Sequence, residues 1–174
     1  MIREYIVIAF TENQIGVLNR ITAAYLRRKI NIESLKVSES SIKGISMFVI
    51  SAFTTEEVID KLVKQIRNII DVLQVEYYSE DQLITQEIAL YKISSKVMKQ
   101  NGTVESIIRT WNARIIEINP SYVVIEKTGA REEIESMRED LQGKGILTEY
   151  TRSGSVVLHR HSLEGVLEEK IQGK

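Results

Sequence analysis

The residues with the clearest chemical character follow the first apolar segment of the chain, where the sequence reads Glu12-Asn13-Gln14-Ile15-Gly16-Val17-Leu18. A glycine at the start of a helix lets a ligand approach the backbone, and the N–H groups there favour a carboxylate. The side-chain amide of Asn13 offers a donor and an acceptor, and Asn31 offers a second amide. The apolar wall beside them would come from Ile15, Val17, Leu18 and Ile32. Together these groups predict a small site for an apolar amino-acid zwitterion.

A plainer interpretation of the same segment stays open. Asparagine and related polar residues are common in turns and at helix starts. The segment therefore also fits an ordinary capped helix, with Asn13 or Gln14 in a turn. The motif alone does not decide between these two interpretations.

Little else in the sequence predicts catalysis. The chain has no cysteine, which excludes disulfides, thiolate zinc sites and a cysteine nucleophile. His159 and His161 would share one face of a strand, but no carboxylate stands beside them at a metal-ligand spacing. No glycine-rich phosphate loop and no Gly-x-Ser-x-Gly motif is present. We therefore predict no catalytic residues and no metal site, and we expect both histidines to be ordinary surface residues.

Composition limits the classes of partner. The 174 residues are 43% hydrophobic and 27% charged, a globular balance. A net charge of -1 argues against a protein built to neutralise nucleic-acid phosphates or to bind anionic lipid. No apolar run approaches the roughly 20 residues of a membrane span, and the N-terminus does not resemble a signal peptide. We expect a soluble, cytoplasmic protein without nucleic-acid or membrane partners.

The hydrophobic pattern predicts the order βαββαβ twice, which corresponds to an α+β fold of two tandem ferredoxin-like domains. We predict a first domain at 1–80, a second at 81–160 and a tail at 161–174. A short strand is expected from Ser155, and a short amphipathic helix in the tail would use Leu163, Val166, Leu167 and Ile171.

Two details of the first domain make further predictions. Thr54 and Glu57 have the spacing of a capping box at the start of the second helix. The strand at 45–53 is apolar at successive positions, so both of its faces need cover. The second cover would come from another part of this chain or from a second subunit.

The βαββαβ order is also typical of RNA-recognition modules. In those modules the third strand carries aromatic side chains that stack on bases. The corresponding positions here hold Ile45, Met47 and Ile50. Without aromatic rings, and with a net charge near zero, RNA binding is disfavoured.

Several motifs together match one known family. The longest are Glu12-Asn13-x-x-Gly16-Val17-Leu18-x-Arg20-Ile21 and Asn31-Ile32-Glu33-Ser34-Leu35-x-Val37. Shorter matches follow at Val72-Leu73-x-Val75, Glu87-x-Ala89-Leu90-x-Lys92, Asn119-Pro120-Ser121-Tyr122, Thr128-Gly129 and Arg152-Ser153-Gly154. With this set, nearly the whole chain resembles the small, regulatory subunits of acetolactate synthase (acetohydroxyacid synthase), whose N-terminal domain is an ACT domain.

The resemblance implies a subunit without an active site of its own. Such a subunit binds the catalytic (large) subunit, raises its activity and confers feedback inhibition by a branched-chain amino acid, usually valine. The catalytic partner would carry thiamine diphosphate, Mg²⁺ and FAD. The resemblance also implies a homodimer with the effector between paired ACT domains. By this likeness the effector site comprises Asn13, Gly16, Asn31 and Ile32, with Asn19 and Ser38 nearby.

Three residues depart from the family's usual pattern: Ile15, Lys29 and Ser38. Lys29 stands where a glycine usually ends the first helix, and a lysine in a left-handed backbone there costs about 1 kcal/mol. The departures leave the choice among valine, leucine and isoleucine open. An alternative function is a free-standing ACT-domain amino-acid sensor or adaptor without a synthase partner. A further alternative, an enzyme in its own right, lacks candidate catalytic residues.

Overall fold

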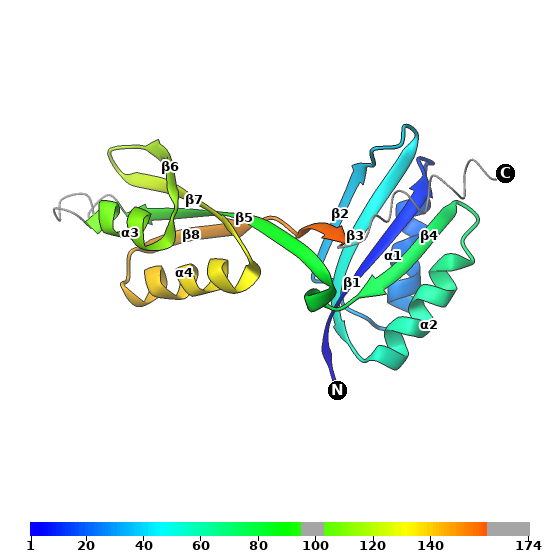
Figure 1. Ribbon diagram of the computed structural model, residues 1–174. Coiled ribbons are helices and arrows are strands. Elements are labelled where there is room, and N and C mark those ends of the chain that lie inside the picture. The colour runs from blue at the N-terminus through cyan, green and yellow to red at the C-terminus, as the bar shows by residue number, and fades with distance from the viewer. Residues whose placement is uncertain (95–102, 160–174) are drawn as a thin grey trace. The chain divides into compact units, whose positions relative to one another are not determined.

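The computed structural model describes residues 1–94 and 103–159 and contains two compact units (Figure 1). The first has β1 (Arg3–Glu12), α1 (Val17–Arg27), β2 (Ser34–Glu39), β3 (Ile45–Thr54), α2 (Glu56–Arg67) and β4 (Val72–Tyr78). A 3-10 helix, η1 (Glu80–Gln82), leads to β5 (Leu83–Ser94), α3 (Thr103–Trp111), β6 (Arg114–Ile118), β7 (Tyr122–Gly129), α4 (Arg131–Gly143), β8 (Leu147–Arg152) and β9 (Val156–His159). The predicted α+β class and the repeated βαββαβ order are confirmed.

The first sheet has the strand order β2-β3-β1-β4, so β1 is flanked on both sides and β2 lies at an edge. Neighbouring strands are antiparallel. Alternate residues of β1, such as Val7, enter a core with Ile21 of α1 and Leu62 of α2, and all three are fully buried.

The opposite face of the first sheet is also apolar, as the sequence of β3 indicated. Its buried residues are Ile6, Ile8, Phe10, Ile45 and Val49. Leu83, the first residue of β5, and Val157 of β9 pack against them. Part of the cover therefore comes from the chain itself, one of the two sources that the sequence left open. RNA-recognition modules expose this face to bases, so its burial also disfavours RNA binding.

The second unit repeats the arrangement with the strand order β6-β7-β5-β8, and β9 pairs with β5 outside that path. Its core joins Tyr91 of β5, Ile125 of β7 and Ile134 of α4, all fully buried. The Tyr91 hydroxyl donates a hydrogen bond to the Ile134 carbonyl at 2.8 Å, which satisfies a polar group inside the core. Pro120 lies in the turn between β6 and β7, as its position between two predicted strands indicated.

The boundary between the units differs from the predicted one at 80/81. The compact units divide after Thr85, and residues 155–159 belong to the first unit. The physical reason is that Leu83 and Val157 both pack on the first sheet. The short strand predicted from Ser155 is present as β9, whereas the predicted tail helix lies outside the described residues.

The predicted capping box at the start of α2 is wrong. Thr54 is the last residue of β3, and Thr55 is the N-cap of α2 without a side-chain capping hydrogen bond. Glu57 instead accepts a hydrogen bond from Lys61, one helical turn later, at 2.5 Å. The capping box fails because Thr54 belongs to β3, so the N-cap position is one residue later than the motif requires.

Three helices are followed by a residue with a left-handed backbone. After α1, the Ile30 N–H donates to the Tyr25 carbonyl at 3.1 Å and the Lys29 N–H to the Leu26 carbonyl at 3.0 Å. This pair of bonds is a Schellman motif, which needs a positive φ at its central residue. Lys29 supplies it with φ 55°, as Asn112 (φ 47°) does after α3 and Gly145 (φ 66°) after α4. The helix end therefore has the left-handed backbone that the family comparison of residue 29 implied.

Replacing Lys29 with glycine is expected to raise the free energy of unfolding by about 0.5–1 kcal/mol. The gain is the relief of left-handed strain, about 1–2 kcal/mol, less the unfolded-state entropy of glycine, about 0.4–1 kcal/mol. Urea denaturation followed by circular dichroism measures the change. Lys29→Ala is the control, since it keeps the Cβ and should gain nothing. Equal midpoints for the glycine variant and the wild type would contradict the assignment of strain.

Candidate functional site

The loop between β1 and α1 leaves a helix start open. The loop lies between Glu12, where β1 ends, and Val17, where α1 begins. Gly16 is the N-cap, with φ 89°, and no side chain caps the helix. The first N–H groups of a helix have no partner within it, so here they suit a carboxylate. The side-chain cap of the plainer interpretation is therefore absent, but its turn is present. The Gln14 N–H donates to the Glu12 carbonyl at 2.9 Å, and the Val17 N–H donates to the Gln14 carbonyl at 3.4 Å.

Distant residues hold this loop in place. The Asn13 N–H donates to the Gly44 carbonyl at 3.0 Å, and the Glu12 N–H donates to the Asp71 carbonyl at 2.9 Å. The Asp71 carboxylate, only 12% exposed, also accepts from the Arg20 guanidinium at 2.5 Å. Asp71 thus ties the end of β1 to α1. Sequence analysis missed Asp71 and Gly44 as anchors, because no local pattern links them to a loop so far away in the chain.

The Arg20–Asp71 pair is expected to show a coupling energy of about 1 kcal/mol in a double-mutant cycle, because one partner is nearly buried. Arg20→Gln, Asp71→Asn and the double variant would be compared by urea denaturation.

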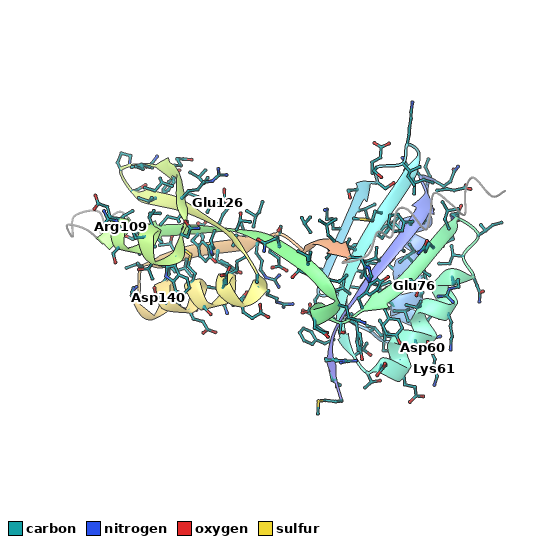
Figure 2. The ribbon with its side chains drawn as sticks, in the orientation of Figure 1. Asp60, Lys61, Glu76, Arg109, Glu126 and Asp140 are labelled. Atoms are coloured by element: carbon teal, nitrogen blue, oxygen red, sulfur yellow. The ribbon has the colours of Figure 1, made fainter. Side chains whose placement is uncertain are left out.

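The control cycle uses Lys64 and Asp60 on α2, a pair at 2.7 Å whose side chains are both substantially exposed (Asp60 is labelled in Figure 2). Its coupling should be about 0.3–0.5 kcal/mol. A coupling for Arg20–Asp71 no larger than the control would contradict its role as an anchor of the loop.

The predicted site residues do not all lie together in one copy of the chain. Two rows of paired residues across β2, β3 and β1 mark the ends of the sheet. The first row is Glu39, Ser46 and Thr11. The second row, at the other end, is Ser34, Ser51 and Ile6. These rows are five residues apart, about 16–17 Å at the rise of a strand. Asn13 follows the first row and Asn31 precedes the second. One copy therefore cannot place both amides on one small ligand.

The predicted apolar wall divides into exposed and buried residues. Ile15 is fully exposed and Leu18 is partly exposed, so both offer surface beside the loop. Val17 is buried in the core and holds α1 against the sheet instead. Ile32 is partly buried against the same core, at the Asn31 end.

The remaining polar residues also lie apart. Asn19 is an exposed residue of α1, close to the loop in sequence. The Asn31 amide donates to Glu33 at 2.9 Å. Ser38 pairs with Met47, which packs on the face opposite the helices, so Ser38 points to that face. The structure thus groups Asn13 to Asn19 and separates them from Asn31 and Ile32.

The edge strand β2 carries exposed apolar side chains on the helix side of the sheet. Leu35 and Val37 pair with the core residues Ile50 and Phe48, yet they are 38% and 45% exposed. On α1, Leu18 and Leu26 lie two turns apart and are also exposed. An apolar strip beside the edge strand of a sheet is a surface that favours association.

The second unit contains a nearly buried ion pair. Glu87, 3% exposed, accepts from Arg152 at 2.7 Å. Arg152 also lies 3.5 Å from Glu135, which accepts from the Tyr150 hydroxyl at 3.0 Å. Burial, followed by this hydrogen bond, raises the pKa of Tyr150 to about 12, so the hydroxyl remains a donor at neutral pH. These contacts join β5, β8 and α4 and support the fold of the unit.

The described residues contain no cluster of three or more histidine or acidic side chains that could hold a metal ion. His159 packs its ring against Tyr78, with ring centroids 4.7 Å apart. His161 lies outside the described residues. Among the helices that the structure describes, none is long and apolar enough to cross a membrane.

Comparison with known proteins covers both units. Residues 8–74 match the model of an AHAS small subunit-like ACT domain, and residues 86–161 match the model of the small subunit of acetolactate synthase. The acetolactate synthase small subunit of Aquifex aeolicus is 32% identical over 159 residues, which are 91% of this chain and 82% of that protein. The chain belongs to the acetolactate synthase small subunit family.

Two further relatives agree with this assignment. The small subunit of Bacillus subtilis is 31% identical over 149 residues, 85% of this chain and 86% of that protein. The crystal structure of the acetolactate synthase small subunit from Thermotoga maritima has a TM-score of 0.80 at 26% identity, and the match covers 92% of this chain and 99% of that one. The family resemblance seen in the sequence motifs is confirmed, and the first unit is an ACT domain.

Proposed function

We propose that this chain is the regulatory subunit of an acetolactate synthase. It binds the catalytic subunit, raises its activity and makes it sensitive to a branched-chain amino acid, with valine the first candidate. Family membership over both units, together with the uncapped helix start at Gly16, supports this proposal. Thiamine diphosphate, Mg²⁺ and FAD are expected on the catalytic partner, and the chemistry takes place there. This chain supplies the effector site.

Two copies of the chain complete that site. An antiparallel contact between two β2 strands, related by a two-fold axis, brings the end of β2 near Glu39 to the start of β2 in the second copy. The Asn13–Gly16 loop of one copy then approaches Asn31 and Ile32 of the second copy. The separation of the two amides within one copy, and the exposed Leu35 and Val37 at that edge, support this arrangement.

The two ends of the ligand are recognised by different groups. The carboxylate takes the first-turn N–H groups beside Gly16, where no side chain competes for them. The amides of Asn13 and of Asn31 in the second copy hold the remaining polar atoms. Ile15 and Leu18 offer exposed apolar surface to the aliphatic side chain. A ligand with this contact set is a small apolar amino acid.

Binding can regulate the synthase only if the ligand prefers one arrangement of the complex over another. An effector that contacts two copies has such a preference, because it binds the paired ACT domains and not a separated one. A coupling of about 1–3 kcal/mol changes the affinity or activity of the partner by roughly 5–150-fold.

Valine titrated into the purified chain is expected to release or absorb heat with saturation at millimolar concentration or below. Gly16→Asp should abolish the heat, because its carboxylate takes the anion site. Gly145→Asp is the matched control: Gly145 also has a positive φ, 66° against 89° for Gly16, but lies in the second unit. Absence of heat with the wild-type chain for all three branched-chain amino acids would contradict the effector site.

Val37→Asp at the β2 edge is expected to shift the chain towards monomers and to remove the valine response together with the dimer. Sedimentation velocity gives the association state and calorimetry gives the binding. Ile70→Asp is the control, since Ile70 is an almost fully exposed residue of the same unit outside β2. Valine binding by a monomeric Val37→Asp variant would contradict a site shared by two copies.

Reconstitution with the cognate catalytic subunit tests the function itself. Synthase activity should rise on addition of this chain and fall again when valine is added. Valine binding without any effect on the synthase would favour the alternative, a free-standing amino-acid sensor.

A further inference from the structure

The second unit leaves an edge strand open that the proposed function does not use. All five residues of β6, Arg114–Ile118, are exposed, and three of them are isoleucines. Ile115, Ile116 and Ile118 are 41%, 50% and 59% exposed. β6 lies at the edge of its sheet, and none of the strands in residues 1–94 and 103–159 pairs with its outer side. An apolar exposed edge of this kind favours association.

The position of β6 corresponds to that of β2 in the first unit. The strand orders are β2-β3-β1-β4 and β6-β7-β5-β8, so each is the edge strand that follows the first helix of its unit. Ile115 and Ile118 pair with Ile125 and Val123, whose side chains enter the core. These two isoleucines therefore lie on the helix side of the sheet, as Leu35 and Val37 do in the first unit.

A bulge limits how a partner can bind at this edge. The register between β6 and β7 shifts between Ile115 and Glu117, which leaves Ile116 as the extra residue. A bulge bends the strand and discourages the addition of a long regular strand. The contact is therefore short and depends on side chains.

The charges on β6 complement one another across a two-fold axis. Arg114 pairs with Glu126 of β7, which Figure 2 labels, and Glu117 pairs with Val124. Glu126 and Val124 are two residues apart on β7 and share a face of the sheet, so Arg114 and Glu117 share that face as well. An antiparallel alignment of β6 with itself, centred between Ile115 and Ile116, places Arg114 of each copy opposite Glu117 of the other. The same alignment places Ile115 opposite Ile116, so charged and apolar residues are satisfied together.

Both charged groups have capacity for a further partner. The Arg114 Nε donates to Glu126 at 2.6 Å, but the side chain is largely exposed and has further N–H groups. Glu117 accepts one hydrogen bond, from the Tyr122 hydroxyl at 2.8 Å, and is exposed. A carboxylate can accept several hydrogen bonds, so Glu117 can accept a further one from a second copy.

We propose that β6 is a second self-association surface, whose partner is β6 of another copy of this chain. The exposed isoleucines supply the apolar contact, and the reciprocal Arg114–Glu117 pairs fix its antiparallel register. This contact is separate from the β2 edge and from the effector site. A contact between two five-residue strands is weak by itself.

The first experiment compares three variants of the full chain by sedimentation velocity over a wide range of concentrations. Ile116→Asp/Ile118→Asp is expected to raise the dissociation constant of self-association at least about tenfold. Ile84→Asp/Ile88→Asp is the matched control, because these are two isoleucines of similar exposure on β5. Val37→Asp tests the β2 contact separately. Circular dichroism checks that each variant is folded.

The outcomes separate the two contacts. Self-association of Ile116→Asp/Ile118→Asp identical to that of the wild type overturns the β6 proposal, even where Val37→Asp dissociates. Dissociation of the β6 variant with no effect of Val37→Asp supports the β6 surface and contradicts the proposed β2 pairing.

The second experiment tests whether the partner is another copy. In a homodimer of the Glu117→Arg variant, the new arginine of each copy faces Arg114 of the other copy. In a homodimer of the Arg114→Glu variant, the new glutamate faces Glu117 of the other copy. The second variant also carries Glu126→Gln, so that its new carboxylate does not face Glu126 in the same copy. Each variant alone should associate less than the wild type, and an equimolar mixture should recover the association, because both cross-axis pairs are then Arg–Glu. A mixture that associates no better than its components overturns self-pairing in this register.

Discussion

The antiparallel register of β2, β3 and β1 is the constraint on which the rest of the regulatory design depends. It sends the chain from Asn13, at one end of the sheet, through α1 to Asn31 at the other end. No rearrangement of side chains can bring the two amides together, because about 16–17 Å of sheet lies between the rows that they flank. A site that uses both must be shared by two copies, so binding of a ligand becomes sensitive to assembly.

The loop that would meet the ligand carboxylate is held rigidly, although it has no side-chain cap. Its backbone is fixed by Gly44 and Asp71, and Arg20 locks Asp71 to the helix. The Val17 N–H donates to the Gln14 carbonyl at 3.4 Å, and no side chain caps the N–H groups that follow it in the first turn. The groups that hold the loop are therefore different from the first-turn N–H groups that the proposed carboxylate would use.

The two units share one architecture but differ in which of their apolar surfaces are buried. In the first unit the sheet face opposite the helices is buried under Leu83 and Val157, so surface for partners remains at its β2 edge. In the second unit exposed apolar side chains again lie at the equivalent edge, β6, and Ile88 and Leu90 of β5 are exposed as well. An edge strand with exposed apolar side chains is suited to pairing through that edge.

The sequence by itself determined the fold class, the order of elements and the family. Apolar spacing of two and of three to four residues encodes strands and helices locally, and the motifs around Gly16 and Asn31 are contiguous in the chain. The family likeness, by which a glycine usually stands at residue 29, also pointed to the left-handed backbone there.

Only the tertiary structure decided how these parts meet. The sequence placed Asn13 and Asn31 in one pocket, whereas the sheet register put them at opposite ends. Thr54 fitted a cap but belongs to β3, and Asp71 anchors a loop that no local pattern connects to it. The unit boundary moved because Leu83 and Val157 pack on the first sheet. Each of these features depends on contacts between distant residues, and the periodicity of a single segment carries no information about them.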